Sequence, residues 1–216
     1  LKFIGSPSTG TDHLNLNLIK KKGIECFDIS KEYKLIKKFT ATSELAFSLI
    51  LNLNRRIIEA SQKAEKGFWS REEFQGYQLY GKTLGIIGFG RLGKISARIG
   101  NGFGMKIIAN DIKKTKKENY VNMVSLDNLI KNSDIITIHI HLNKDTENLI
   151  NYDLLKKMKN SAFLINTSRG KIIKEEDLLI ALKKKLIRGA GLDVIDGEWL
   201  DDKKRNRHKL ISYARK

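Results

Sequence analysis

The feature that most constrains this chain is the glycine-rich stretch at residues 83–93, Thr-Leu-Gly-Ile-Ile-Gly-Phe-Gly-Arg-Leu-Gly. The apolar run at 84–87 predicts a short buried strand, and the residues after the glycines predict a helix. Between them, Gly88, Gly90 and Gly93 have the G-x-G-x-x-G spacing of a dinucleotide-binding turn. The first glycine allows a tight turn, the second lets the backbone approach a pyrophosphate, and the third lets the helix pack closely on the strand.

The residues that follow strengthen this interpretation. A second apolar strand is predicted at 105–109, and it ends at Asn110 and Asp111. Asp111 lies 18 residues after Gly93, where a carboxylate would accept a hydrogen bond from a ribose 2′-hydroxyl and disfavour a 2′-phosphate. The alternative is a glycine-rich surface turn with a solvated aspartate at a strand end. The order strand, helix, strand and acid favours a nucleotide site.

The rest of the chain continues this alternation of short apolar runs with helical patterns. Further strands are predicted at residues 121–124, 134–140, 162–166 and 187–194, and helices at 126–131, 152–158 and 175–184. Ser125 and Asn151 are the predicted N-caps of the first two helices. The fold class indicated is α/β, with a doubly wound parallel sheet of the Rossmann type.

The pattern also predicts a division of the chain. Residues 1–43 have a strand, helix and strand too short to close a core, and we expect them to be the remnant of a substrate domain. Residues 44–200 are predicted as the nucleotide-binding domain. It begins with one long helix at 44–66, capped by Ser43 and apolar nearly all round, as expected between two domains. Residues 201–216 form a charged, basic tail that ends before a last strand.

Composition excludes some function classes. The formal net charge is +17, but the lysines are dispersed and not interleaved with aromatic residues, so we expect no nucleic-acid partner. No apolar run approaches the roughly 20 residues of a membrane span, so we expect no membrane partner. The single cysteine, Cys26, cannot form an internal disulfide, which suits a cytoplasmic protein.

Polar side chains follow the predicted strands at the edge where open α/β sheets bind ligands. They are His139, Thr167, Ser168, Arg169, Asp193 and Glu198. A guanidinium offers a planar fork to a carboxylate, so Arg169 is the best candidate for substrate recognition; its alternative is a surface ion pair. Glu198 could raise the pKa of a neighbouring imidazole and orient it, although an exposed glutamate is ordinary. No metal site is predicted, because His139 and His141 alternate along a strand.

Several segments together resemble the D-isomer-specific 2-hydroxyacid dehydrogenases. The similar segments are residues 81–93, 133–139, 165–170, 174–182 and 189–198, with shorter likenesses at 9–12 (substrate loop) and 43–44 (interdomain helix). This resemblance implies an NAD-dependent oxidoreductase that transfers a hydride between nicotinamide and the CH–OH or C=O carbon of a small 2-hydroxy or 2-oxo acid. It also implies a homodimer, with an interface around the long helix and the connection 67–81.

The resemblance assigns roles to individual residues. Arg169 would bind the carboxylate and carbonyl of the substrate, and Glu198 would pair with a catalytic histidine. The residues expected to contact NAD are Gly88, Gly90, Arg91, Leu92, Gly93, Asp111, His139, Thr167, Ser168 and Asp193.

The chain departs from the family pattern at three places. His141 and Trp199 stand where proline is usual. The Pro-His loop that carries the catalytic histidine is missing, and His208, only ten residues past Glu198 in a basic run, is a poor substitute. We therefore expect a fragment whose catalytic histidine lies beyond Lys216 and which turns over little by itself. The alternative is an NAD-binding sensor or scaffold without turnover, similar to the C-terminal-binding-protein co-repressors.

Overall fold

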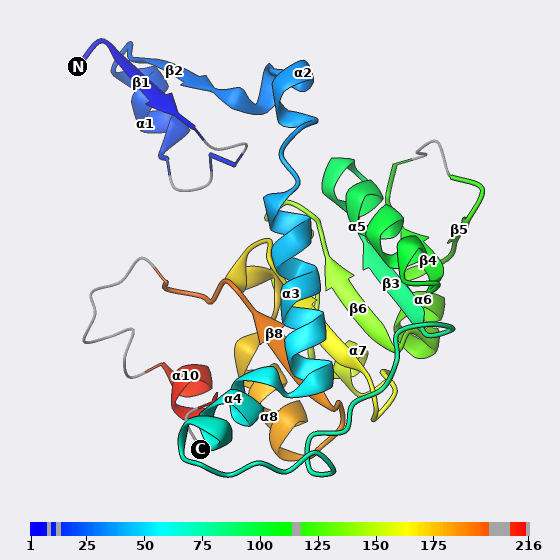
Figure 1. Cartoon of the computed structure of the whole chain (residues 1–216). Coiled ribbons are helices and arrows are strands. Elements are labelled where there is room, and N and C mark those ends of the chain that lie inside the picture. Colours follow the sequence, from blue (N-terminus) through cyan, green and yellow to red (C-terminus); the bar gives the residue numbers. More distant parts are fainter. Residues whose placement is uncertain (8–9, 12–13, 114–117, 199–207, 215–216) are drawn as a thin grey trace. The chain divides into compact units, whose positions relative to one another are not determined.

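The computed structural model describes residues 1–7, 10–11, 14–113, 118–198 and 208–214 (Figure 1). The chain divides into two compact units, residues 1–40 and 41–216, and each is described by itself. Thr9 and Asp12 of the predicted substrate loop lie outside the described residues, as does Trp199.

The first unit is a small parallel pair of strands with short helices. Its elements are β1 (Phe3–Ser6), α1 (Leu16–Lys21), β2 (Glu25–Asp28), the 3-10 helix η1 (Ile29–Lys31) and α2 (Tyr33–Ile36). Strand β1 pairs in parallel with β2, and the Asn15 side chain caps α1 by accepting a hydrogen bond from Leu18 N. Phe3 and Phe27 remain exposed on this two-stranded sheet.

The second unit is built on a six-stranded parallel sheet in the order β5-β4-β3-β6-β7-β8. The strands are β3 (Thr83–Ile87), β4 (Lys106–Asn110), β5 (Val121–Met123), β6 (Ile135–Ile138), β7 (Phe163–Asn166) and β8 (Gly189–Leu192). The chain runs outward from β3 in one direction and then returns to β6 to build the other half. The sheet therefore has the predicted doubly wound Rossmann topology, with its switch point between β3 and β6.

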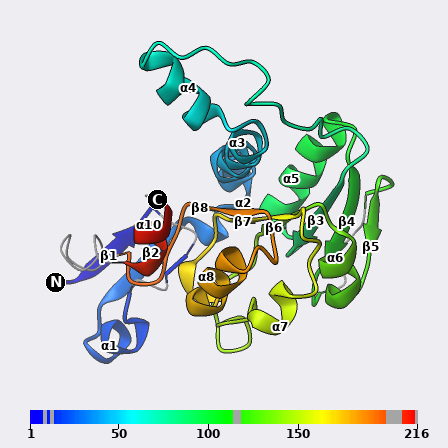
Figure 2. The same cartoon turned by 90° about the horizontal axis from the view of Figure 1, so that it is seen from below.

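Helices cover both faces of the sheet (Figure 2). One face carries α3 (Ala41–Arg55) and α5 (Arg91–Gly102), and the other carries α6 (Leu126–Asn132), α7 (Tyr152–Leu155) and α8 (Glu175–Lys183). The remaining helices are α4 (Ile57–Glu65), the 3-10 helix η2 (Gly170–Ile172) and α10 (Lys209–Ala214). Side chains of a strand alternate between faces, so Ile86 packs in the α3 and α5 core and Ile87 in the α6 to α8 core.

The prediction of one continuous helix over 44–66 is wrong. Helix α3 begins at Ala41 and ends at Arg55, and Arg56 takes a left-handed conformation with φ of 51° before α4 begins. The Asn52 side chain accepts a hydrogen bond from Ile58 N across this break, giving the backbone a partner outside a regular helix.

Ser43 is likewise not an N-cap. It lies inside α3, is fully buried, and donates to Leu92 O at 3.1 Å. The compact units divide between Thr40 and Ala41, three residues before the predicted boundary. Within the described parts of the chain, every helix is too short or too polar to cross a membrane.

Candidate active site

The glycine-rich turn between β3 and α5 is shaped by close backbone approaches. Gly88 has φ of +92°, a conformation that side chains rarely adopt, and a Cβ there would lie 2.6 Å from His139 O. A Cβ on Gly93 would lie 2.0 Å from Gly88 O, so the helix could not approach the turn with a larger residue. By contrast, a Cβ on Gly90 would meet nothing within 4 Å. The turn is thus tightly packed at Gly88 and Gly93, whereas open space remains next to Gly90.

The N-terminus of α5 faces this open space. Gly90 is the N-cap and has no side chain to accept from the first N–H groups of the helix. Arg91, the first residue of α5, is partly buried, and this burial lowers the pKa of its guanidinium. Leu92 contributes its carbonyl oxygen to the buried Ser43 hydroxyl. The start of this 12-residue helix has no side-chain cap, and its N–H groups and dipole have the character that phosphate groups favour.

Asp111 is held beside the glycine turn by backbone donors. Its Oδ2 accepts from Phe89 N at 2.7 Å, and its Oδ1 accepts from Lys113 N at 2.8 Å. Gly88 N donates to Asn110 O at 2.8 Å and joins the same two segments. The carboxylate predicted to meet a ribose therefore lies at the end of β4, directly bonded to the turn that follows β3.

His139 directly follows the end of β6, and its imidazole is neutral at pH 7. Its Nε2 lies 2.9 Å from Ser96 Oγ and 3.1 Å from Thr137 Oγ1, whereas its buried Nδ1 has no hydrogen-bond partner among the described residues. Burial lowers the pKa of His139 to about 4. Ser96 was not predicted as a site residue. The sequence feature that could have indicated it is a polar residue on the side of α5 that packs on the sheet. His141 is exposed.

The loop after β7 is organised by a buried amide that sequence reasoning did not assign. Asn166 Nδ2 donates to Arg169 O at 2.9 Å, and its Oδ1 accepts from Ser168 N at 3.0 Å. Ser168 Oγ donates to Ile138 O at 2.8 Å, which ties this loop to the end of β6. Thr167 Oγ1 is buried without a hydrogen-bond partner among the described residues.

The segments that carry Arg169 and Glu198 lie against each other. A Cβ on Gly170 would fall 2.1 Å from the Ile195 carbonyl carbon, so only glycine permits this approach. Arg169 Nη1 donates to Ser168 O at 2.8 Å, and Ile195 N donates to Glu198 Oε2 at 3.4 Å. Exposed Asp193 joins the two loops through its N–H, which donates to Asn166 O at 3.0 Å.

Glu175, at the start of α8, is a third residue that the sequence did not single out, after Ser96 and Asn166. Its Oε1 accepts from Asp196 N at 2.8 Å, and its Oε2 lies 2.8 Å from His208 Nε2. Burial raises the pKa of the Glu175 carboxyl against the opposing effects of these donors. Glu175 thus holds the loop that leads to Glu198 and also engages the His208 imidazole.

The predicted residues fit a dinucleotide. Phosphates fit the uncapped helix start, and a ribose fits the Asp111 carboxylate. Two buried polar atoms, His139 Nδ1 and Thr167 Oγ1, lack a partner among the described residues, and both follow strands at this edge. A bound group commonly supplies the partner of such atoms. No cluster of three or more metal-ligating side chains is found in the described segments.

Comparison with known proteins agrees with this geometry. Residues 47–215 match the model of the D-isomer specific 2-hydroxyacid dehydrogenase, NAD binding domain. The chain belongs to the D-isomer specific 2-hydroxyacid dehydrogenase family. Its matched segment is the NAD-binding domain of that family, so NAD is its cofactor.

Relatives of this chain are named as reductases or dehydrogenases of small acids. It is 40% identical over 208 residues to a glyoxylate reductase of Thermococcus litoralis, covering 92% of this chain and 61% of that protein. It is 36% identical to a hydroxypyruvate reductase of Thermotoga maritima, with coverages of 98% and 67%. The D-lactate dehydrogenase of Aquifex aeolicus complexed with NAD and lactic acid has a TM-score of 0.81 and 35% identity, covering 97% of this chain and 62% of that one. The chain spans about three fifths of the length of most of these curated relatives.

Proposed function

We propose that the protein is an NAD-dependent oxidoreductase acting on a small 2-hydroxy or 2-oxo acid. When bound, NAD supplies or accepts the hydride at C2 of the acid. The observation that carries the proposal is the juxtaposition of the Arg169 and Glu198 loops, with the close approach at Gly170, at the same sheet edge as the glycine turn. Glyoxylate, hydroxypyruvate and pyruvate are the first substrates to test, since relatives are named for these acids or for lactate.

Arg169 would recognise the substrate. A guanidinium can donate two parallel hydrogen bonds to a carboxylate, or one to the carboxylate and one to the carbonyl oxygen whose negative charge grows during reduction. Asn166 supports this role, because its amide bonds both Arg169 O and Ser168 N and so fixes the backbone from which the guanidinium extends.

Glu198 would hold the imidazole that exchanges the substrate proton. A carboxylate beside an imidazole raises its pKa and orients it for acid–base work. Two described histidines have other partners: His208 pairs with Glu175, and His139 bonds Ser96 and Thr137. We therefore assign the proton transfer to neither of these two histidines.

The experiment measures NADH oxidation by the complete gene product with glyoxylate, hydroxypyruvate and pyruvate. Arg169→Ala should lower kcat/KM about 1000-fold, because two charge-assisted hydrogen bonds contribute on the order of 4 kcal/mol. Arg169→Lys should recover part of this loss. Arg98→Ala, on the exposed side of α5, is the matched control and should leave kcat/KM unchanged. Tight NADH binding without turnover of any 2-oxo acid would contradict the proposed enzymatic activity and favour an NAD-binding sensor or scaffold.

We also propose a homodimer, a cytoplasmic location, and residues 1–43 as part of the substrate domain. Support for the dimer comes from exposed apolar side chains on α4 and the connection after it: Ile57, Ile58, Phe68 and Trp69, the last 89% exposed. Such a patch is costly to leave in water. The unpaired cysteine Cys26 suits a reducing compartment. Sedimentation of the complete gene product and of Trp69→Ser would test the interface.

A further inference from the structure

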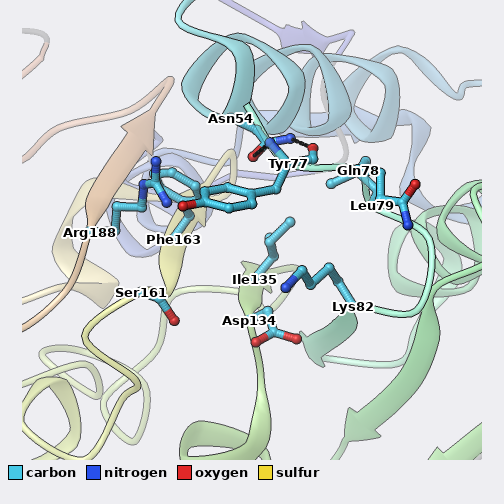
Figure 3. Close-up of a pocket in the computed structure, with 10 residues that line it drawn as sticks. All are labelled: Asn54, Tyr77, Gln78, Leu79, Lys82, Asp134, Ile135, Ser161, Phe163 and Arg188. Carbon is cyan, nitrogen blue, oxygen red and sulfur yellow. Dashed lines mark hydrogen bonds between the residues drawn. The ribbon is translucent and has the colours of Figure 1, made fainter. Parts of the chain in front are cut away.

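A pocket of about 260 Å³ lies at the amino edge of the sheet, opposite the nucleotide turn. Its lining includes the residues just before four strands: Lys82 before β3, Asp134 before β6, Ser161 near the start of β7, and Arg188 before β8. Tyr77, Gln78 and Leu79 close it from the connection that leads into β3 (Figure 3). None of these residues belongs to the candidate active site.

The pocket has an apolar floor. Leu79, Ile135 and Phe163 are each less than a tenth exposed and present hydrocarbon to the cavity. One wall is the aromatic ring of Tyr77, which is 58% exposed. The backbone of Tyr77 is fixed by buried Asn54, whose Nδ2 donates to Tyr77 O and whose Oδ1 accepts from Tyr77 N. The backbone that carries this wall is therefore held in position before any ligand arrives.

Two cations lie at the pocket, and neither is within ion-pair distance of a carboxylate of the described residues. The Arg188 guanidinium carbon is 4.9 Å from the centre of the Tyr77 ring and 5.5 Å from that of Phe163. Lys82 Nζ is 5.8 Å from the Tyr77 ring. In Figure 3 the Arg188, Tyr77 and Phe163 side chains gather on one side of the pocket, and Lys82 lies across from them.

The one carboxylate of the lining, Asp134, is already compensated. Its Oδ1 lies 2.9 Å from Lys159 Nζ, and its Oδ2 accepts from Thr83 N at 2.8 Å. Burial raises the pKa of Asp134, but these two donors outweigh it and the net pKa is lowered. The charge of Lys82 adds to this lowering, so one carboxylate faces the three cations Lys82, Lys159 and Arg188, and the pocket is positive.

From this combination we infer that the amino-edge pocket binds a small planar organic anion: its flat apolar body lies on the Leu79, Ile135 and Phe163 floor, and its carboxylate is attracted by the charges of Arg188 and Lys82. Ligand pockets commonly pair a mostly apolar lining with a few fixed polar groups. A cavity of this volume suits a ligand of one aromatic ring. The site is distinct from the nucleotide site, because the two lie at opposite ends of the same parallel strands.

The test is a saturation-transfer NMR titration of the protein with benzoate and with benzamide, its uncharged counterpart. We expect benzoate to bind with a dissociation constant on the order of 1 mM, and benzamide at least fivefold more weakly. Saturating NADH should leave benzoate bound. Lys82→Gln and Arg188→Gln should each weaken benzoate at least fivefold, and Arg188→Lys less.

Lys184→Gln is the matched control, because Lys184 also stacks on an aromatic ring, Tyr152, but lies outside the pocket lining. It should leave benzoate affinity unchanged. If Arg188→Gln fails to fold, Lys82→Gln still tests the inference, because Lys82 is exposed and its replacement should leave the fold intact. Any of four results would overturn the inference. Benzamide could bind as tightly as benzoate, or NADH could displace benzoate. Both pocket variants could keep a benzoate affinity within twofold of the wild type, or benzoate binding could be lost as the protein dimerises.

Discussion

Strand β3 is held at both ends by an aspartate, and the two ends differ in what surrounds the carboxylate. At the amino end, Asp134 accepts from Thr83 N at 2.8 Å and also pairs with Lys159. At the carboxyl end, Asp111 accepts from Phe89 N at 2.7 Å and from Lys113 N, and the described residues offer it no cation within ion-pair distance. Similar hydrogen bonds thus leave one carboxylate neutralised and the other with its charge available to a hydroxyl ligand.

The two edges of the sheet as a whole show the same contrast. At the carboxyl edge, other backbone segments lie very close to Gly88, Gly93 and Gly170, and the buried polar atoms of this edge are uncharged. The amino edge is made of long cationic side chains lying on rings. A ligand at the first edge would be recognised by a rigid frame, and a ligand at the second by side chains that can adjust.

Among changes that compare the two edges of the sheet, the largest effect should come from adding one methyl group to the rigid frame. In Gly93→Ala the new Cβ meets Gly88 O at 2.0 Å, so the turn or α5 must shift. We expect unfolding free energy to fall by about 3 kcal/mol and NADH affinity to fall about 100-fold, as measured by denaturant titration and fluorescence. Gly102→Ala, on the same helix with nothing within 4 Å of its Cβ, should leave NADH affinity unchanged and raise the unfolding free energy by at most about 1 kcal/mol. Equal behaviour of the two variants would mean that the close approach is not required.

His139 should make the carboxyl edge sensitive to acid. Its pKa in the folded protein is about 4, whereas an unfolded histidine titrates near 6.5. The unfolded chain therefore binds the proton first, and stability present above pH 6.5 is lost as the pH falls toward 4. The loss at pH 4 should be about 3 kcal/mol. The difference in unfolding free energy between the wild type and His139→Gln, measured as a function of pH, isolates this contribution. If that difference stays constant between pH 7 and 4, His139 is not a buried neutral imidazole.

The contrast between the edges also explains what the sequence could predict. The strand, turn and helix at residues 83–93, the alternation of strands and helices along the chain, and the caps Ser125 and Asn151 depend on local spacing, and the structure agrees with them. The break at Arg56 was missed because it depends on side chains reaching across it, such as Asn52. Glu175 and Asn166 were missed because their partners are brought to them only by folding.

The amino-edge pocket could not be predicted for the same reason. Its lining comes from α3, from the connection before β3, and from the residues that precede or begin four strands, with no shared spacing in the chain. A motif is visible in a sequence only when one segment carries most of a site. Arg169 and Glu198 were proposed from their position after strands, a rule that applies to the carboxyl edge alone.

The smallest effect, and the sharpest comparison, is between Asp111→Asn and Asp134→Asn. Each change keeps a side-chain oxygen that can accept from Phe89 N or Thr83 N, and each removes one negative charge. Both should lower the unfolding free energy by about 1 kcal/mol, the difference between a charged and a neutral acceptor.

Only Asp111→Asn should alter cofactor choice. Without its charge, the repulsion of a ribose 2′-phosphate is removed, so the ratio of NADH to NADPH affinity should fall about tenfold, or about 1.4 kcal/mol. Asp134→Asn should keep the wild-type ratio and instead tighten benzoate at the amino edge, because it removes a negative charge beside the cations. If the two variants alter the NADH to NADPH ratio equally, the cause is movement of β3 rather than the charge of Asp111, and the distinction between the two ends of the strand would be lost.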